Sequence, residues 1–149
     1  LEYLDLNQIQ TFDITTLTSL VNLEDLQLGW NRIIDISPLA SLNKLQKLYL
    51  GSNKITDISP LTTLVKLKDL ILRSNGIVDI SPLKSLVKLR CINLESNQIA
   101  DVSPLSALIN LKQLHLQSNR IVDVSPLAAL NRTHINIEPN EAIDLTPIE

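Results

Sequence analysis

The sequence predicts a solenoid of mixed α/β class, in which short strands and short helical turns repeat along one axis. Asparagines recur every 22 residues from Asn31 to Asn119, and prolines keep the same interval from Pro38 to Pro126. Hydrophobic residues make up 44% of the chain, but aromatic residues only 3%. Because nearly all the apolar mass is Leu, Ile and Val, the composition favours stacked short segments over one compact core.

Each repeat follows the frame L-x-x-L-x-L-x-x-N-x-I-x-D-I-x-P-L-x-x-L, which is the leucine-rich-repeat signature. Repeats start near residues 1, 23, 45, 67, 89 and 111, and a degenerate last repeat starts near 133. The first repeat has Ile9 in place of Asn, and the last is one residue short before Asn140. Neither end carries a clear polar cap, so we expect an exposed hydrophobic cross-section at each end. We interpret residues 1–149 as one leucine-rich-repeat domain and expect it to be a fragment of a longer protein.

Each frame contains a short strand. Leu48 and Leu50, for example, lie two residues apart and point to one face, while the residue between them points to the other. We expect every strand to pair in parallel with its neighbours, about 4.8 Å apart. The leucines then line the interior, and the variable residues line the outside.

The residues after each strand turn the chain. The recurring Asn side chain can donate and accept hydrogen bonds, so it can reach backbone groups of its own turn and of the next coil. The Ser before each Pro predicts an N-cap, followed by proline at the first position of a short 3₁₀ turn. The predicted structural ladder is Asn31, Asn53, Asn75, Asn97 and Asn119.

A column of aspartates precedes the turns by two residues. These carboxylates could accept hydrogen bonds from backbone N–H groups of the turn, or they could bind calcium. A calcium site needs six or more converging oxygens, so capping is the favoured interpretation. The column consists of Asp13, Asp35, Asp57, Asp79, Asp101, Asp123 and Asp144.

The segment from Ile33 to Leu39, IIDISPL, and its four close copies resemble the 22-residue repeats of the internalins, a family of bacterial surface proteins. The resemblance covers almost the whole chain. It implies a right-handed solenoid with a concave parallel sheet, short 3₁₀ turns on the convex side, and adhesion or receptor binding by the concave residues. The leucine-rich regulatory subunit of protein phosphatase 1 has a similar strand and Asn pattern but usually lacks the regular proline, which therefore favours the internalins.

The outward strand positions form the predicted partner surface. Three of the four aromatic residues, Tyr3, Trp30 and Tyr49, fall on or beside it, and such rings are enriched in binding hot spots. Gly29 and Gly51 leave room for a shallow depression flanked by rings. The alternative is that Trp30 covers the Asn turn and Tyr49 is a solvated strand residue. The predicted partner-binding residues are Tyr3, Asp25, Gln27, Trp30, Lys47, Tyr49, Ile71, Arg73, Asn93 and His115.

Composition and motifs argue against other functions. The formal charge of −3 gives no overall attraction for nucleic acid or anionic lipid. No apolar run approaches the roughly 20 residues that span a bilayer, so we expect no membrane insertion. No phosphate loop, metal-ligand motif or catalytic constellation occurs, so we expect no catalysis, metal or cofactor, and the lone Cys91 is interpreted as a passive strand residue.

The sequence thus predicts a monomeric, non-catalytic module that holds a protein ligand on its concave face. We expect a secreted or cell-surface location. The alternative is an intracellular regulatory scaffold, similar to the phosphatase subunit, in the cytoplasm. A basic rim of Lys and Arg residues that precedes the strands could dock an acidic or phosphorylated partner, although solvated side chains are its usual explanation.

Overall fold

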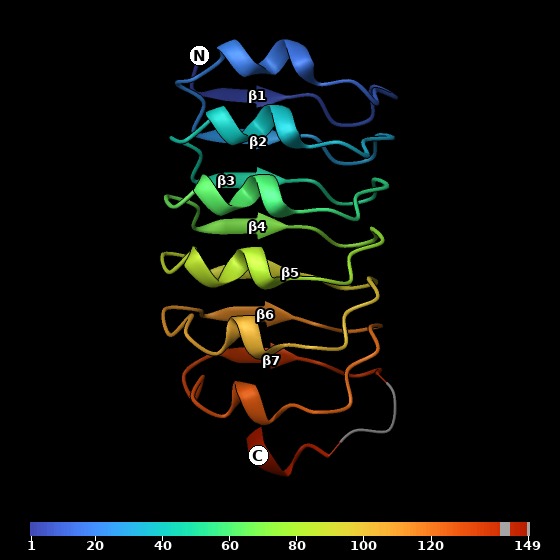
Figure 1. Cartoon of the computed structure of the whole chain (residues 1–149), viewed down its shortest axis with the longest axis vertical. Helices are drawn as coiled ribbons and strands as arrows, with labels where there is room; N and C mark the ends of the chain where they lie inside the picture. The colour runs from blue at the N-terminus through green and yellow to red at the C-terminus, as the bar shows by residue number, and fades with distance from the viewer. Residues whose placement is uncertain (141–143, 149) are drawn as a thin grey trace.

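The protein is a stack of coils built around one parallel sheet (Figure 1). A computed structural model describes residues 1–140 and 144–148. Each strand pairs in parallel with the strands before and after it, in the order of the sequence. The strands are β1 (Tyr3–Asp5), β2 (Asp25–Gln27), β3 (Lys47–Tyr49), β4 (Asp69–Ile71), β5 (Cys91–Asn93), β6 (Gln113–His115) and β7 (His134–Asn136).

A short 3₁₀ turn follows every strand and lies on the opposite side of its coil from the sheet (Figure 1). The open parallel sheet and the 3₁₀ turns confirm the predicted fold class. The turns are η1 (Thr15–Ser19), η2 (Ser37–Ser41), η3 (Ser59–Thr63), η4 (Ser81–Ser85), η5 (Ser103–Leu105), η6 (Ser125–Leu127) and η7 (Thr146–Ile148).

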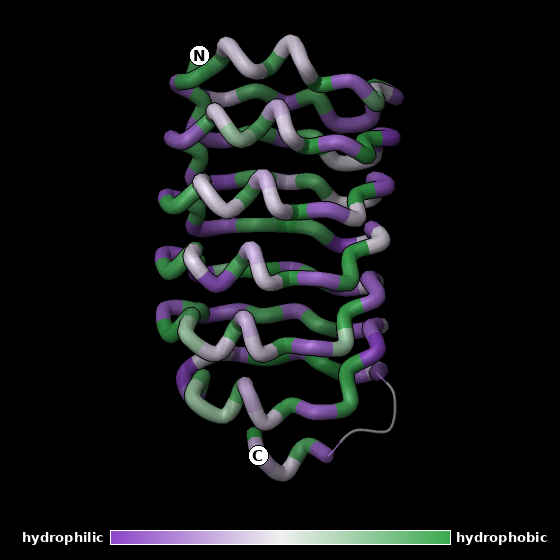
Figure 2. Tube along the Cα trace, in the orientation of Figure 1, coloured by the Kyte–Doolittle hydropathy of each residue, from purple (hydrophilic) through white to green (hydrophobic). Residues whose placement is uncertain are grey.

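The core is a column of aliphatic side chains enclosed by the coils. Leu48 and Leu50 of the third coil, Ile55 after its Asn and Leu61 in its turn are all 0% exposed. Hydrophobic and hydrophilic positions alternate in the same order in successive coils (Figure 2). Because every coil buries its apolar side chains against the coils above and below, the stack as a whole forms the core.

The recurring asparagines connect each coil to the one before it. The Asn53 side-chain amide donates to the carbonyls of Leu50 in its own coil (2.9 Å) and Leu28 in the preceding coil (3.0 Å). Its Oδ1 accepts from the backbone N–H of Ile33, also in the preceding coil, at 3.0 Å. The repeat pattern predicted contact with the next coil, whereas these hydrogen bonds join each Asn to the preceding coil.

The aspartates, and not the serines, accept the hydrogen bonds at the start of the turns. Ser37 already belongs to η2, Ile36 occupies the N-cap position, and no side-chain capping bond is made there. Asp35 Oδ1 accepts from the backbone N–H of Ser37 at 2.8 Å. The predicted serine N-cap is therefore wrong, because the N–H of Leu39, which a Ser37 cap would bind, already donates to the carbonyl of Ile36 at 2.9 Å. The same bond recurs from Thr15 to Asp13 and from Thr146 to Asp144.

The degenerate last repeat still completes the ladder. Asn140 Oδ1 accepts from the backbone N–H groups of Asn119 and Ile121, both at 3.1 Å. Its side-chain amide donates to the carbonyls of Leu116 and Ile137. The missing residue before Asn140 therefore does not interrupt the stacking, and the peptide between Glu138 and Pro139 in this stretch is cis.

Candidate functional site

The outward side chains of the strands form one continuous surface, which we call the sheet face. Strand register aligns equivalent positions of successive coils, as in the neighbours Gln27, Tyr49 and Ile71. Eight of the ten predicted partner-binding residues lie on the strands themselves, whereas Trp30 and Arg73 follow the ends of β2 and β4. The eight are Tyr3, Asp25, Gln27, Lys47, Tyr49, Ile71, Asn93 and His115.

A shallow depression of about 170 Å³ lies on the sheet face of the first four coils. It brings together five of the predicted residues. It does not include Tyr3, Asp25, Lys47, Asn93 or His115. Its lining consists of Asn7, Gln27, Gly29, Trp30, Tyr49, Gly51, Ser52, Ile71 and Arg73.

Trp30 stands out in this depression through its backbone conformation and its exposure. It adopts the left-handed conformation, with φ of 58°, and its side chain is 60% exposed. Ser52, Ser74 and Ser96 hold the same conformation at the equivalent position of later coils. A bulky residue in this region costs about 1–3 kcal/mol, and an exposed ring gains little packing in return. Trp30 is therefore unfavourable for the fold at a position that the first coil fills with Gln8 and the third to sixth coils fill with Ser.

Two glycines form the floor of the depression. A Cβ on Gly29 would lie 3.2 Å from Asn7 Oδ1, which accepts a hydrogen bond from the Gly29 N–H at 2.6 Å. A Cβ on Gly51 would lie 3.1 Å from Cγ of Arg73 and 3.7 Å from Cγ2 of Ile71. The absence of side chains at these positions keeps the space beside Trp30 open.

Tyr49 lines the depression and is partly buried. Burial raises the pKa of its hydroxyl above the ordinary value of 10.0, and the negative charges of Asp69 and Asp25 add to the increase. The ring therefore stays neutral at physiological pH and presents a hydroxyl that can donate a hydrogen bond. Arg73 supplies a guanidinium at the rim, 3.9 Å from a carboxylate oxygen of Glu95. The depression thus combines aromatic surface with both donors and acceptors.

The second half of the sheet face is polar. Asn93 Oδ1 accepts from the backbone N–H of Glu95 at 3.0 Å, so this predicted contact residue also shapes its own loop. Asn136 Nδ2 lies 3.1 Å from His115 Nδ1.

Asn7 and Ser52 line the depression but were missing from the predicted partner-binding residues. Asn7 occupies the same frame position as Gly29 and Gly51, and that shared position was the available signal. Ser52 occupies the frame position of Trp30, one coil later. Ser52 lines the depression because its backbone is left-handed. The repeat frame does not predict this conformation at a residue other than Gly.

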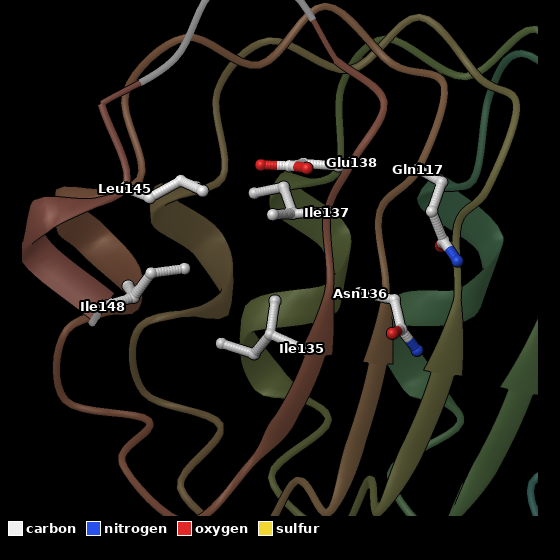
Figure 3. A pocket seen from close by; sticks show the side chains of 7 residues that line it. All are labelled: Gln117, Ile135, Asn136, Ile137, Glu138, Leu145 and Ile148. Carbon is white, nitrogen blue, oxygen red and sulfur yellow. The ribbon is translucent and has the colours of Figure 1, made fainter.

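A larger cavity, about 380 Å³, lies at the last described coil (Figure 3). Ile135, Ile137, Leu145 and Ile148 project into the space between β7 and η7 (Figure 3). Gln117 Oε1 is buried there without a hydrogen-bond partner among the described residues.

The described residues contain no cluster of three or more His, Cys, Asp or Glu side chains that could hold a metal ion. The aspartate column instead accepts backbone hydrogen bonds at the turns. Burial raises the pKa of the Cys91 thiol, and the charge of Asp69 raises it further, so less of the nucleophilic thiolate is present at neutral pH. Among the described helices, none has the length and hydrophobicity needed to cross a membrane.

Comparison with family models places most of the chain in known repeats. The model described as leucine-rich repeats (2 copies) matches residues 21–63, 65–107 and 87–129. A comparison with curated proteins gave no match.

Two internalins of known structure are similar over nearly the whole chain. An internalin (inlF) from Listeria monocytogenes is 35% identical, with a TM-score of 0.78 over 99% of this chain and 51% of the internalin. Internalin C2 (inlC2) from the same species is 31% identical, with a TM-score of 0.73 over 97% of this chain and 74% of the internalin. The chain therefore spans about half the length of the inlF structure and about three quarters of the inlC2 structure.

Proposed function

We propose that this chain, which belongs to the leucine-rich-repeat family and is internalin-like, binds a protein partner on its sheet face. The sheet face is the concave face implied by the internalin resemblance. The depression around Trp30 and Tyr49 is the anchor of this site, and the polar strand residues farther along form its rim. Binding is non-catalytic, because the depression offers contact surface and no group placed to carry out a reaction.

The exposed, left-handed Trp30 is the observation that carries this proposal. At 60% exposure the ring contributes little to the core, and its backbone conformation is costly for a bulky residue. A large ring that does not stabilise the fold is best explained by contact with another molecule, since Trp and Tyr dominate binding hot spots. Beside it, Gly29 and Gly51 leave space for one side chain of a partner.

The partner class that we propose is a receptor or another protein at a cell surface. The similarity to two internalins supports adhesion or recognition and a secreted or surface location. A single chain contains the whole depression, so the proposed binding unit is a monomer. The regular proline of the repeats favours this function over an intracellular regulatory scaffold of the phosphatase-subunit type.

The experiment is a parallel pull-down with the chain and its Trp30→Ala/Tyr49→Ala variant. Each is presented to host-surface proteins and to cytosolic proteins, and captured proteins are identified by mass spectrometry. We expect a membrane-receptor ectodomain that the wild type captures and the variant does not. Capture of a cytosolic enzyme would instead support the scaffold function. Equal capture by wild type and variant would show that the anchor lies elsewhere.

Two matched variants make the result specific. Gly51→Leu fills the depression while both rings remain, so it should weaken binding of the captured protein about tenfold or more if a side chain enters there. Lys84→Ala changes an exposed residue of η4 on the opposite side of the coil and should leave the affinity within about twofold. Surface plasmon resonance with the purified partner measures both.

A further inference from the structure

The two edges of the solenoid, beside the sheet face, carry opposite charge. The loops that lead into the strands hold exposed or half-buried cations in successive coils. Glu2 and Glu24 are the acidic residues at the corresponding positions of the first two coils. We call this side the basic edge, formed by Lys44, Lys66, Lys68, Lys88, Arg90, Lys112 and Arg132.

The loops that follow the strands form the acidic edge. Its aspartates are all exposed, and one oxygen of each carboxylate accepts the backbone bond at the start of the next turn. This edge also holds three cations, each three residues before an aspartate: Arg32, Lys54 and Arg120. The aspartates outnumber them, so the edge is negatively charged overall. The acidic edge consists of Asp13, Asp35, Asp57, Asp79, Asp101, Asp123 and Asp144.

A column of exposed aliphatic or aromatic side chains accompanies each row of charges. On the basic edge, Val65 (49% exposed) and Val87 (50%) immediately precede Lys66 and Lys88. Val21 (46%) and Ile109 (71%) hold the same frame position before Asn22 and Asn110. On the acidic edge, each member immediately precedes an aspartate; these are Phe12 (70%), Ile34 (60%), Val78 (56%) and Val122 (52%). Apolar side chains repeated at one exposed position indicate a surface that is covered in use.

We propose that the basic edge of one copy of this chain packs against the acidic edge of a second copy, side by side along the solenoid axis. The two edges are opposite in charge, and both carry an apolar column. They also repeat once per coil of the same fold, at the strand spacing of about 4.8 Å. A second copy therefore matches coil with coil. With an offset of one coil, the basic-edge residues Lys44, Lys66 and Lys88 of one copy oppose Asp57, Asp79 and Asp101 of the other. Val21 and Val65 then oppose Ile34 and Val78, whereas Asn43 and Thr56 interrupt the two apolar columns.

This contact is heterologous, because it joins two different surfaces of the chain. Each added copy leaves one free basic edge and one free acidic edge, so the contact builds open rows and no closed dimer. The sheet face lies between the edges and stays uncovered, which would place several copies of the partner-binding depression side by side. The monomer expected from the sequence remains the state at low concentration, because exposed charge pairs are individually weak.

Sedimentation velocity of the whole chain tests the contact. The weight-average mass should rise with protein concentration at about 50 mM salt and fall to the monomer value at about 500 mM, because salt screens exposed charges. Two double variants each block one edge: Lys66→Glu/Lys88→Glu on the basic edge and Ile34→Ser/Val78→Ser on the acidic edge. All four positions are exposed, and circular dichroism with thermal unfolding checks that both variants fold.

Each double variant alone should stay monomeric at low salt, since every contact needs one edge of each kind. A mixture of the two should form dimers and nothing larger, because one variant keeps its acidic edge and the other its basic edge. A wild type that stays monomeric at every concentration and salt would overturn the proposal. So would a mixture that fails to pair, or a monomeric wild type that binds phosphatidylserine vesicles through its basic edge.

Discussion

The side-chain amide of Asn53 donates a hydrogen bond to the carbonyl of Leu28 in the preceding coil, at 3.0 Å. The Oδ1 atom of the same side chain accepts from the N–H of Ile33, again in the preceding coil. One amide therefore satisfies backbone groups of two coils at a point where the chain turns and has no strand partner. This relationship makes each coil depend on the next one along the chain.

Replacing one ladder residue should destabilise the protein markedly. Asn97 is 7% exposed and bonds with Ile77 N–H, Leu72 O and Leu94 O, so Asn97→Leu leaves buried backbone groups without partners. We expect the free energy of unfolding to fall by about 3 kcal/mol. Urea unfolding measures this, with Asn43→Leu at an exposed position as control, where the change should stay within about 0.5 kcal/mol. Equal effects of both substitutions would contradict the role of the ladder.

Replacing Trp30 should not harm the fold. Trp30→Ser introduces the residue found at the equivalent position of the next four coils, and it removes a bulky side chain from a left-handed backbone. The melting temperature should therefore stay unchanged or rise. The corresponding gain in the free energy of unfolding should be no more than about 1–3 kcal/mol. Thermal unfolding followed by circular dichroism measures it. A clear loss of stability would mean that the ring packs as part of the fold, and the case for a binding role would weaken.

Acid should destabilise the turns. The backbone N–H of Ser59 holds the pKa of Asp57 below the ordinary value of 3.8, and Ser81 and Ser103 act in the same way on Asp79 and Asp101. A folded pKa below the unfolded one gives stability that is present above about pH 4 and is lost as the pH falls through the folded value. The melting temperature should therefore drop between about pH 4 and pH 2.

Amide variants separate this effect from general acid unfolding. In Asp57→Asn/Asp79→Asn/Asp101→Asn, the amide oxygen can still accept the turn N–H, but the side chain no longer titrates. The drop in melting temperature below pH 4 should be smaller than in the wild type. A wild type that gains stability on acidification would show that repulsion within the aspartate column outweighs the hydrogen bonds.

Calcium should not stabilise the protein. The aspartates of the turn column accept backbone hydrogen bonds, and among the residues with described positions no group of acidic, His or Cys side chains converges as a metal site requires. A ligand that binds only the folded state raises its melting temperature. Titration with calcium chloride, with magnesium chloride of equal ionic strength as control, should leave the melting temperature unchanged. A calcium-specific increase would contradict the capping role of the column.

The fold was largely predictable because every coil has the same sequence frame, so the same frame positions are buried in each coil. The spacing of Leu48 and Leu50 predicted the strand and its buried face, and both side chains are 0% exposed. The serine N-cap was wrong because the frame does not show at which residue the turn begins. Ser37 lies inside η2, and the carbonyl of Ile36 accepts the N–H of Leu39. The direction of the ladder also could not be read from Asn53, since an amide can bond equally well to either neighbouring coil.

The candidate site was predictable only in part. Trp30, Tyr49 and Gly51 could be placed near one another from the frame, because equivalent positions of successive coils are neighbours. The left-handed backbone at Trp30 and the enclosure by Asn7 and Ser52 depend on backbone angles and side-chain packing between coils. The identity of a partner depends on a complementary surface, and that information lies in another molecule.

Site-directed photo-crosslinking tests the central claim, that the sheet face around Trp30 holds the partner. A photoreactive amino acid replaces Ile71 in the depression or, as control, Lys84 on η4, and each chain is irradiated with the purified partner. We expect a covalent product from position 71 that unlabelled wild type competes away and that disappears when Trp30→Ser is added, with no product from position 84. Equal products from both positions, or a product from position 71 that survives Trp30→Ser, would contradict the proposed site.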